Sequence, residues 1–190
     1  MANSPSLFSD LPPAPAAAHL ARWRGATDAP AALALAELAQ RESRPVVVIT
    51  AGEQRAWRLI DELRFFLGTA LAVTHFPDSE TLPYDPFSPH QEILSQRLAA
   101  LYRLPRQGRG LLVTTAGALL EHLPPRAWLD GRALVVKVGD KLDPGRFREH
   151  LVSAGYQSVS EVQAQGEFAV RGALIDLFPM GSPAAYRLDL

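Results

Sequence analysis

The segment GATDAPAA, residues 25–32, is the best register in this chain for a phosphate-binding loop, but it lacks the residues that carry the chemistry. Such a loop needs glycines that let the backbone approach a phosphate, a lysine for the β- and γ-phosphates, and a Ser or Thr for magnesium. Only Gly25 is kept, because Pro30 stands at the second glycine, Ala31 at the lysine and Ala32 at the hydroxyl. The chain has two lysines, and both follow residue 136, so none lies in or before this loop. The loop is therefore predicted to be degenerate, and we expect neither ATP hydrolysis nor a cofactor.

Three charged residues near the end of the chain lie on the polar sides of predicted strands. Arg171 ends a run of apolar residues, and Arg187 and Asp189 alternate with Tyr186, Leu188 and Leu190. Because successive strand residues point to opposite faces, each charge is opposite a side that holds large apolar residues. If the last strands are neighbours, the three charges form one exposed polar patch. The alternation leaves two interpretations: a solvated sheet face, or a surface whose arginines bind carboxylates of a partner protein.

Other catalytic and metal sites find no support in the residue spacing. The five histidines form neither an HxxxH nor an HExxH pattern, and the absence of cysteine excludes disulfides, thiol catalysis and Cys-rich zinc sites. There is no GxSxG nucleophile elbow, although a Ser/His/Asp triad assembled from distant positions stays open. We expect no metal site and no catalytic residue.

The balance of charge argues against non-specific binding to nucleic acid. Lys and Arg number 19 against 20 Asp and Glu, which gives a formal net charge of -1 and no basic field for a phosphate backbone. The first fifteen residues lack the basic and apolar segments of a signal peptide, and no apolar run reaches the length of a membrane span. We therefore expect a cytoplasmic protein that does not contact a membrane.

Strands and helices are expected to alternate around the degenerate loop. After a loose lead-in at residues 1–18, apolar spacing predicts the following elements: a helix from Asp28, a strand at 45–50, a helix from Gly52 to Gly68, a strand at 71–76, a loop at 77–89, a helix opened by a capping box at 88–91, a strand at 111–115 and a short helix at 116–123. Strands that alternate with helices indicate parallel βαβ units. We predict an α/β domain, degenerate and P-loop-like, over residues 19–128.

A second domain with a different pattern is predicted over residues 129–190. It begins with a strand at 133–138 and a helix from Asp143 that carries Phe147 and Leu151. Strands follow at 168–171, 174–178 and 186–190, the first two separated by a bend at Gly172. This order indicates a small α+β domain with an antiparallel sheet. Since the chain stops within the last predicted strand, we expect a fragment of a longer protein, truncated at the C-terminus of this domain.

Four motifs carry a family resemblance: TLPYD at 81–85, SPHQ at 88–91, AGY at 154–156 and GEFAVRGALIDLFP at 166–179. From about residue 20 to its end, the chain resembles the N-terminal region of bacterial transcription-repair coupling factors (the Mfd family). That region is itself similar to the excision-repair protein UvrB, in the first half of its first domain and in its UvrA-binding domain. The resemblance implies that the phosphate loop, intact in UvrB, has been lost here.

The resemblance also implies a partner and the residues that bind it. The second domain would dock the damage-recognition ATPase UvrA through Arg171, Arg187 and Asp189. Other domains of the full-length protein, an ATP-dependent DNA translocase, would contact RNA polymerase and DNA. These implications predict a non-catalytic module that recruits UvrA to lesion-stalled RNA polymerase. Two alternatives stay open: a fragment of a UvrB-like ATPase or helicase that verifies damage, and a nucleic-acid-binding module with dispersed arginines.

Overall fold

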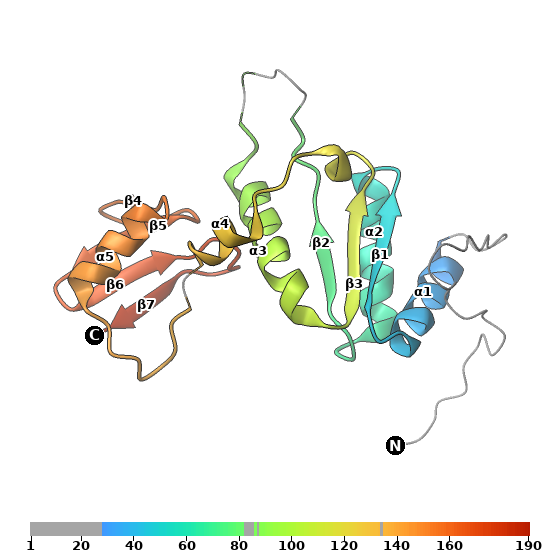
Figure 1. The fold of residues 1–190 in the computed structure, drawn as a ribbon, viewed down its shortest axis with the longest axis horizontal. Helices are drawn as coiled ribbons and strands as arrows, with labels where there is room; N and C mark the ends of the chain where they lie inside the picture. Colours follow the sequence, from blue (N-terminus) through green and yellow to red (C-terminus); the bar gives the residue numbers. More distant parts are fainter. Residues whose placement is uncertain (1–27, 82–85, 87, 134) are drawn as a thin grey trace. The chain divides into compact units, whose positions relative to one another are not determined.

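The computed structural model describes residues 28–81, 86, 88–133 and 135–190, and the chain divides into two compact units. Unit 1 comprises residues 1–78 and 104–120, and unit 2 comprises residues 79–103 and 121–190. Unit 1 holds a parallel three-stranded sheet, and unit 2 holds a mixed four-stranded sheet (Figure 1). The predicted combination of helices with one parallel sheet and one largely antiparallel sheet is therefore confirmed.

Unit 1 follows the predicted alternation of helix and strand. Its elements are α1 (Ala29–Arg41), β1 (Pro45–Thr50), α2 (Glu53–Leu67), β2 (Val73–Phe76), β3 (Gly110–Thr115) and a 3₁₀ turn at Ala118–Leu120. The strand order is β1-β3-β2, and both neighbouring pairs are parallel. Two predicted elements are shorter in the structure: β2 begins at residue 73, and the helix predicted at 116–123 is a single 3₁₀ turn.

The core of unit 1 lies between the two helices and one face of the sheet. Small residues of α1 allow a close approach to α2, whose Leu59, Ile60 and Leu63 are almost fully buried. Leu111 and Val113 of β3 complete this cluster, and β3 is buried along its whole length because it is the central strand. The apolar run of β3 is therefore buried, as expected for a strand of a parallel sheet, but the run of β1 is not, because Val47 and Ile49 are 51% and 56% exposed.

Unit 2 contains most of α3 and every element that follows the 3₁₀ turn. These are α3 (Gln91–Gln107, of which residues 91–103 belong to unit 2), α4 (Arg126–Asp130), α5 (Pro144–Ser153), β4 (Gln157–Ser158), β5 (Glu167–Arg171), β6 (Leu174–Phe178) and β7 (Tyr186–Asp189). The strands lie in the order β4-β5-β6-β7; β4 runs parallel to β5, and the other pairs are antiparallel. The predicted start of α5 is confirmed, because the Asp143 carboxylate accepts a hydrogen bond of 2.8 Å from Arg146 N.

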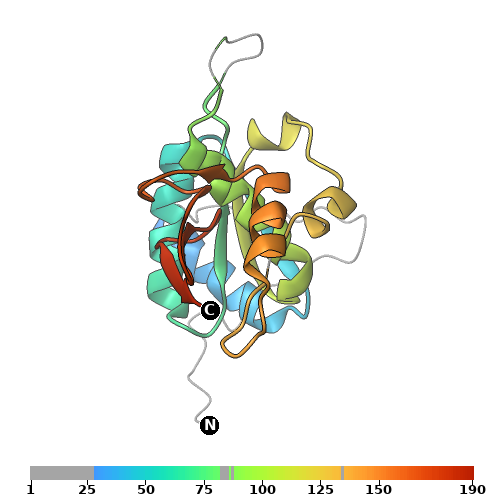
Figure 2. The same ribbon diagram turned by 90° about the vertical axis from the view of Figure 1, so that its left-hand side faces the viewer.

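One face of the unit 2 sheet packs against α5, which is orange in Figures 1 and 2. Phe147 and Leu151 of this helix contact Phe168, Ile175 and Leu177 of β5 and β6. Phe168 and Ile175 are completely buried. Because strand residues alternate between faces, this cluster leaves the intervening charged residues on the opposite face of the sheet.

The strand predicted at residues 133–138 is wrong over the residues that the structure describes. Ala133 and residues 135–138 form no ladder, Val135 is 62% exposed, and residue 134 lies outside the description. Val136 packs against the core of unit 2 without pairing to a strand. The β-branched run therefore has the composition of a strand but no neighbouring strand to complete its hydrogen bonds.

The predicted capping box at the start of α3 is also wrong. The helix begins at Gln91, and the carbonyl of His90 accepts its first hydrogen bond, of 3.1 Å from Leu94 N. Gln91 does not reach back to Ser88, since its side-chain amide donates to the carbonyl of Gln165 within unit 2. A tertiary contact has therefore replaced the local cap that the sequence pattern suggested.

Candidate functional site

The strands of unit 2 place five charged residues on one face of the sheet: Glu167, Arg171, Asp176, Arg187 and Asp189. The strand register pairs Asp176 with Arg187 across β6 and β7, and it aligns Arg171 and Asp189 on either side of Leu174. Residues directly opposite in an antiparallel pair point to the same face. We call this set the arginine face. The three residues predicted from alternation lie on it, although β6 separates the strand of Arg171 from that of the other two.

The guanidinium of Arg187 is held by a carboxylate that the sequence analysis did not single out. Its Nε donates to Asp176 Oδ1 at 2.6 Å, and its Nη2 donates to Asp176 Oδ2 at 2.9 Å. This hydrogen bonding lowers the pKa of Asp176 and raises the pKa of Arg187. The positive charge of Arg171 also lowers the pKa of Asp176. Both arginines therefore act electrostatically on one carboxylate at the centre of the face.

Arg171 is held by a backbone group instead. Its Nη2 donates to the carbonyl of Ser160 at 2.8 Å. The loop that carries Ser160 is organised by Glu167, whose carboxylate accepts hydrogen bonds from the backbone N–H groups of Gln163 and Ala164 at 2.8 and 2.9 Å. Those two bonds lower the pKa of Glu167. The acidic residue at the start of β5 thus shapes the surroundings of Arg171 without contacting it.

Asp189 does not hold Arg187 in place, because Arg187 is bonded to Asp176 instead. The side chain of Asp189 is exposed and has no hydrogen bond to any residue that the structure describes. Leu174 lies opposite it on β6. The carboxylate is therefore available to a cation outside the chain.

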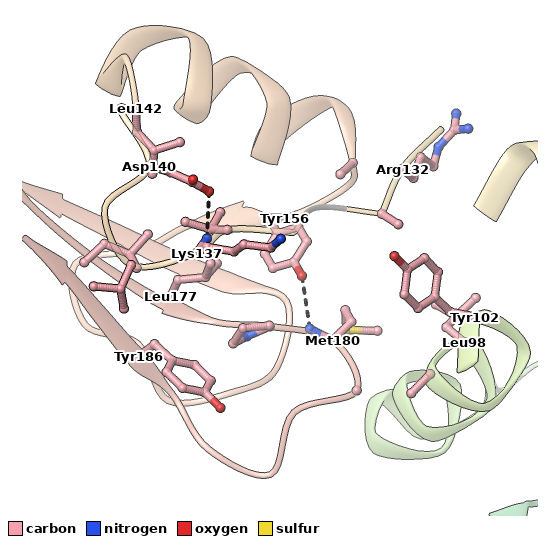
Figure 3. Close-up of a pocket in the computed structure, with 18 of the residues that line it drawn as sticks. Leu98, Tyr102, Arg132, Lys137, Asp140, Leu142, Tyr156, Leu177, Met180 and Tyr186 are labelled. Atoms are coloured by element: carbon pink, nitrogen blue, oxygen red, sulfur yellow. Dashed lines mark hydrogen bonds between the residues drawn. The ribbon is translucent and has the colours of Figure 1, made fainter. Parts of the chain in front are cut away.

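The turn that leads into β7 is fastened to the rest of unit 2. The backbone N–H of Met180 donates to the Tyr156 hydroxyl at 3.0 Å, as Figure 3 shows, and burial raises the pKa of this tyrosine. The N–H of Gly181 donates to the hydroxyl of Ser95, which is fully buried in α3. Tyr156, Met180 and Gly181 line an open cavity of about 820 Å³ whose wall is mostly apolar. The two hydrogen bonds hold the turn that follows β6.

The structure places three of the four degenerate loop positions at the start of α1. Pro30, Ala31 and Ala32 lie in its first turn, and Gly25 lies outside the described residues. Ala32 is fully buried and its N–H donates to the carbonyl of Asp28, while the Asp28 carboxylate pairs with Arg55. An ion pair between Asp28 and Arg55 therefore lies at the start of α1.

A buried histidine lies at the carboxyl end of β2 in unit 1. His75 Nε2 is 3.0 Å from Glu53 Oε2, and its ring meets that of Trp57 edge-on with the centroids 4.4 Å apart. The other oxygen of Glu53 accepts a 2.6 Å hydrogen bond from Asp78 N. Burial lowers the pKa of His75 below its usual 6.5, and this effect outweighs the opposing attraction of Glu53.

We expect unit 1 to lose stability as the pH falls below 6.5, the ordinary pKa of histidine. In that range the unfolded chain takes up a proton that buried His75 resists, so its contribution is present above 6.5 and is lost as the pH falls through the lower folded-state pKa. Native-state hydrogen exchange at the amides of β3, corrected for the intrinsic exchange rate at each pH, measures this slope for unit 1 alone. His75→Gln should flatten it, and His122→Gln, which changes an exposed histidine, is the control. An unchanged slope in His75→Gln would contradict the assignment.

Among the residues that the structure describes, no group of three or more His, Asp or Glu side chains is placed to hold a metal ion. Over the same residues, no helix has both the length and the apolar character needed to cross a membrane.

Comparison with known proteins shows which families this chain resembles. A family model for the UvrB interaction domain matches residues 134–190. The transcription-repair-coupling factor of Escherichia coli (strain K12) is 48% identical over 163 residues, which are 86% of this chain and 14% of that protein. The factor of Haemophilus influenzae (strain ATCC 51907 / DSM 11121 / KW20 / Rd) is 44% identical over 158 residues, and that of Bacillus subtilis (strain 168) is 28% identical over 153 residues. These matches cover 83% and 80% of this chain, and 14% and 13% of those proteins.

The chain therefore spans about one seventh of the length of these relatives, because it covers 14% of the first two. The residues matched by the UvrB interaction domain include the whole arginine face. Together, the matches confirm the resemblance predicted from the sequence: the chain corresponds to the N-terminal, UvrB-homologous region of the transcription-repair-coupling factor family.

Proposed function

We propose that this chain is a non-catalytic recruitment module whose arginine face binds UvrA. The observation that carries the proposal is the placement of Arg171 and Arg187 on one exposed sheet face, inside the region matched by the UvrB interaction domain. In the full-length protein, the module would bring UvrA to RNA polymerase stalled at a lesion in the cytoplasm. Other regions would move along DNA with ATP and contact the polymerase.

The proposed binding is charge-assisted hydrogen bonding by two arginines to acidic groups of UvrA. A guanidinium presents its N–H groups in a planar fork that matches a carboxylate, so two of them recognise an acidic surface with defined geometry. Asp189 would meet a cation of the partner, since no described residue neutralises it. Opposite charges across an interface accelerate association and exclude wrongly charged partners. UvrA would therefore be recognised through the pattern of its charges as well as its shape.

The two domains predicted from the sequence have different proposed roles. Residues 129–190 form the proposed UvrA-binding domain, and residues 19–128 form a degenerate α/β domain that supports it. Pro30, Ala31 and Ala32 support the loss of nucleotide binding, because none supplies the lysine or hydroxyl of a phosphate loop. These features disfavour the alternative of a UvrB-like ATPase that verifies damage.

Arg171→Ala is expected to weaken UvrA binding about tenfold or more, because the partner carboxylate loses its charged donor while staying desolvated. Fluorescence anisotropy of the labelled chain, titrated with purified UvrA, measures the dissociation constant. Arg148→Ala is the matched control, since it removes an exposed arginine of α5 outside the arginine face. Equal affinity of Arg171→Ala and the wild type, with both folded by circular dichroism, would place the binding site elsewhere.

A further inference from the structure

We propose that Asp176 is a positioning residue for UvrA docking: it holds Arg187 by one edge of the guanidinium, so that the other edge faces the partner. The inference rests on the proposed function, because it assigns a role within the same binding face. Asp176 lies on β6, directly opposite Arg187 of β7 in the strand register. The pair is therefore set by the sheet itself and not by a flexible loop.

The geometry of the ion pair leaves a second binding edge free. Arg187 uses Nε and Nη2 for the two oxygens of Asp176, at 2.6 and 2.9 Å. This side-on arrangement takes two of the five guanidinium N–H groups. Among the described residues, none accepts a hydrogen bond from Nη1 of Arg187. The edge formed by Nη1 and the remaining N–H of Nη2 can therefore take a second carboxylate while Asp176 stays bound.

A positioning role requires Asp176 to be less exposed than Arg187, and it is. The side chain of Asp176 is 20% exposed, whereas that of Arg187 is 61% exposed. The acid thus lies closer to the sheet, and the cation extends beyond it toward solvent. A long arginine side chain loses conformational freedom when a partner orders it. Because Asp176 has already ordered Arg187, less of that loss falls on the binding step.

A competing role for Asp176 predicts that its replacement strengthens UvrA binding. As a nearby carboxylate, it could occupy Arg187 in place of the partner and so weaken docking. Removing one negative charge from this face would also strengthen long-range attraction to an acidic surface. Both effects make an Asp176 variant bind more tightly. The side-on pairing favours the positioning role, since the end-on edge of Arg187 does not have to be released before a partner binds.

The test measures UvrA binding by four forms of the chain: wild type, Asp176→Asn, Arg187→Ala and the double variant. Asparagine keeps the shape of the side chain but presents only one acceptor oxygen, so the bidentate pair is lost. We expect Asp176→Asn to weaken binding about fivefold to tenfold when Arg187 is present, and to have no effect in the Arg187→Ala background. Glu149→Gln is the control, because it removes an exposed negative charge of α5 outside the face.

A spectroscopic measurement reports on the orientation without UvrA. In ¹H–¹⁵N spectra, the Nε–H signal of Arg187 should be distinct in the wild type and should join those of solvent-exposed arginines in Asp176→Asn. Binding by Asp176→Asn that equals or exceeds that of the wild type, together with weakened binding by Arg187→Ala, would overturn the positioning role and leave the proposed function intact. If the wild type itself fails to bind UvrA, the proposed function fails, and the docking role of Asp176 fails with it.

Discussion

Replacing Phe168 with alanine is expected to destabilise unit 2 by about 3–5 kcal/mol, because it empties the centre of a small core. The ring is completely buried and packs with residues of α5 and β6. This cluster is the only large apolar contact between α5 and the described part of the sheet, so little surrounding structure can collapse into the gap. Native-state hydrogen exchange at the amides of β6 measures the loss for unit 2 alone, which whole-chain unfolding of a two-unit protein does not.

Val170→Ala provides the matched control for this substitution. Val170 lies on the same strand and the same face as Phe168, two residues farther along, but is 41% exposed. Its truncation should cost about 1 kcal/mol or less, because part of the side chain is already in water. Equal protection of the β6 amides in Phe168→Ala and Val170→Ala would contradict the packing of unit 2 described above.

Reversing both arginines of the arginine face is expected to abolish UvrA binding. In Arg171→Glu with Arg187→Glu, carboxylates would meet the acidic groups proposed on UvrA, and like charges brought together at an interface cost far more than a lost contact. We expect the affinity to fall by about a hundredfold or more. Biolayer interferometry with immobilised UvrA measures this change, and circular dichroism checks the fold.

The control for the double reversal keeps the same change in net charge. Arg146→Glu with Arg148→Glu reverses two exposed arginines of α5, which lie outside the arginine face. This variant should associate somewhat more slowly but keep most of its affinity, because only long-range attraction is reduced. Equal loss in both double variants would show that net charge, and not the arginine face, governs binding.

The elements predicted correctly are those whose residues repeat with a clear period or form an apolar run. The β-branched run at 45–50 and the helical spacing after Gly52 predicted β1 and α2 with their observed bounds or within one residue. At residues 133–138 a similar β-branched run gave no strand, because strand formation also needs a neighbour with free hydrogen-bonding groups. The capping pattern at Ser88 failed for a related reason, since Gln91 found a tertiary partner.

The sequence predicted part of the candidate site. Alternation along each strand is a local property, and it correctly placed Arg171, Arg187 and Asp189 opposite the core. The pairing of Asp176 with Arg187 depends on the register between β6 and β7, which alternation does not contain. Seven residues, 179–185, connect the two strands, and a connection of this length does not fix the register as a two-residue turn does.

Isothermal titration of purified UvrA into the wild-type chain tests the central claim most directly. The account predicts saturable binding with a defined stoichiometry, and an affinity that falls as salt is raised because paired charges are screened. The same titration with the folded double reversal Arg171→Glu and Arg187→Glu should give no binding heat. Absence of binding by the folded wild type, or equal binding by the wild type and the double reversal, would contradict the claim that the arginine face recruits UvrA.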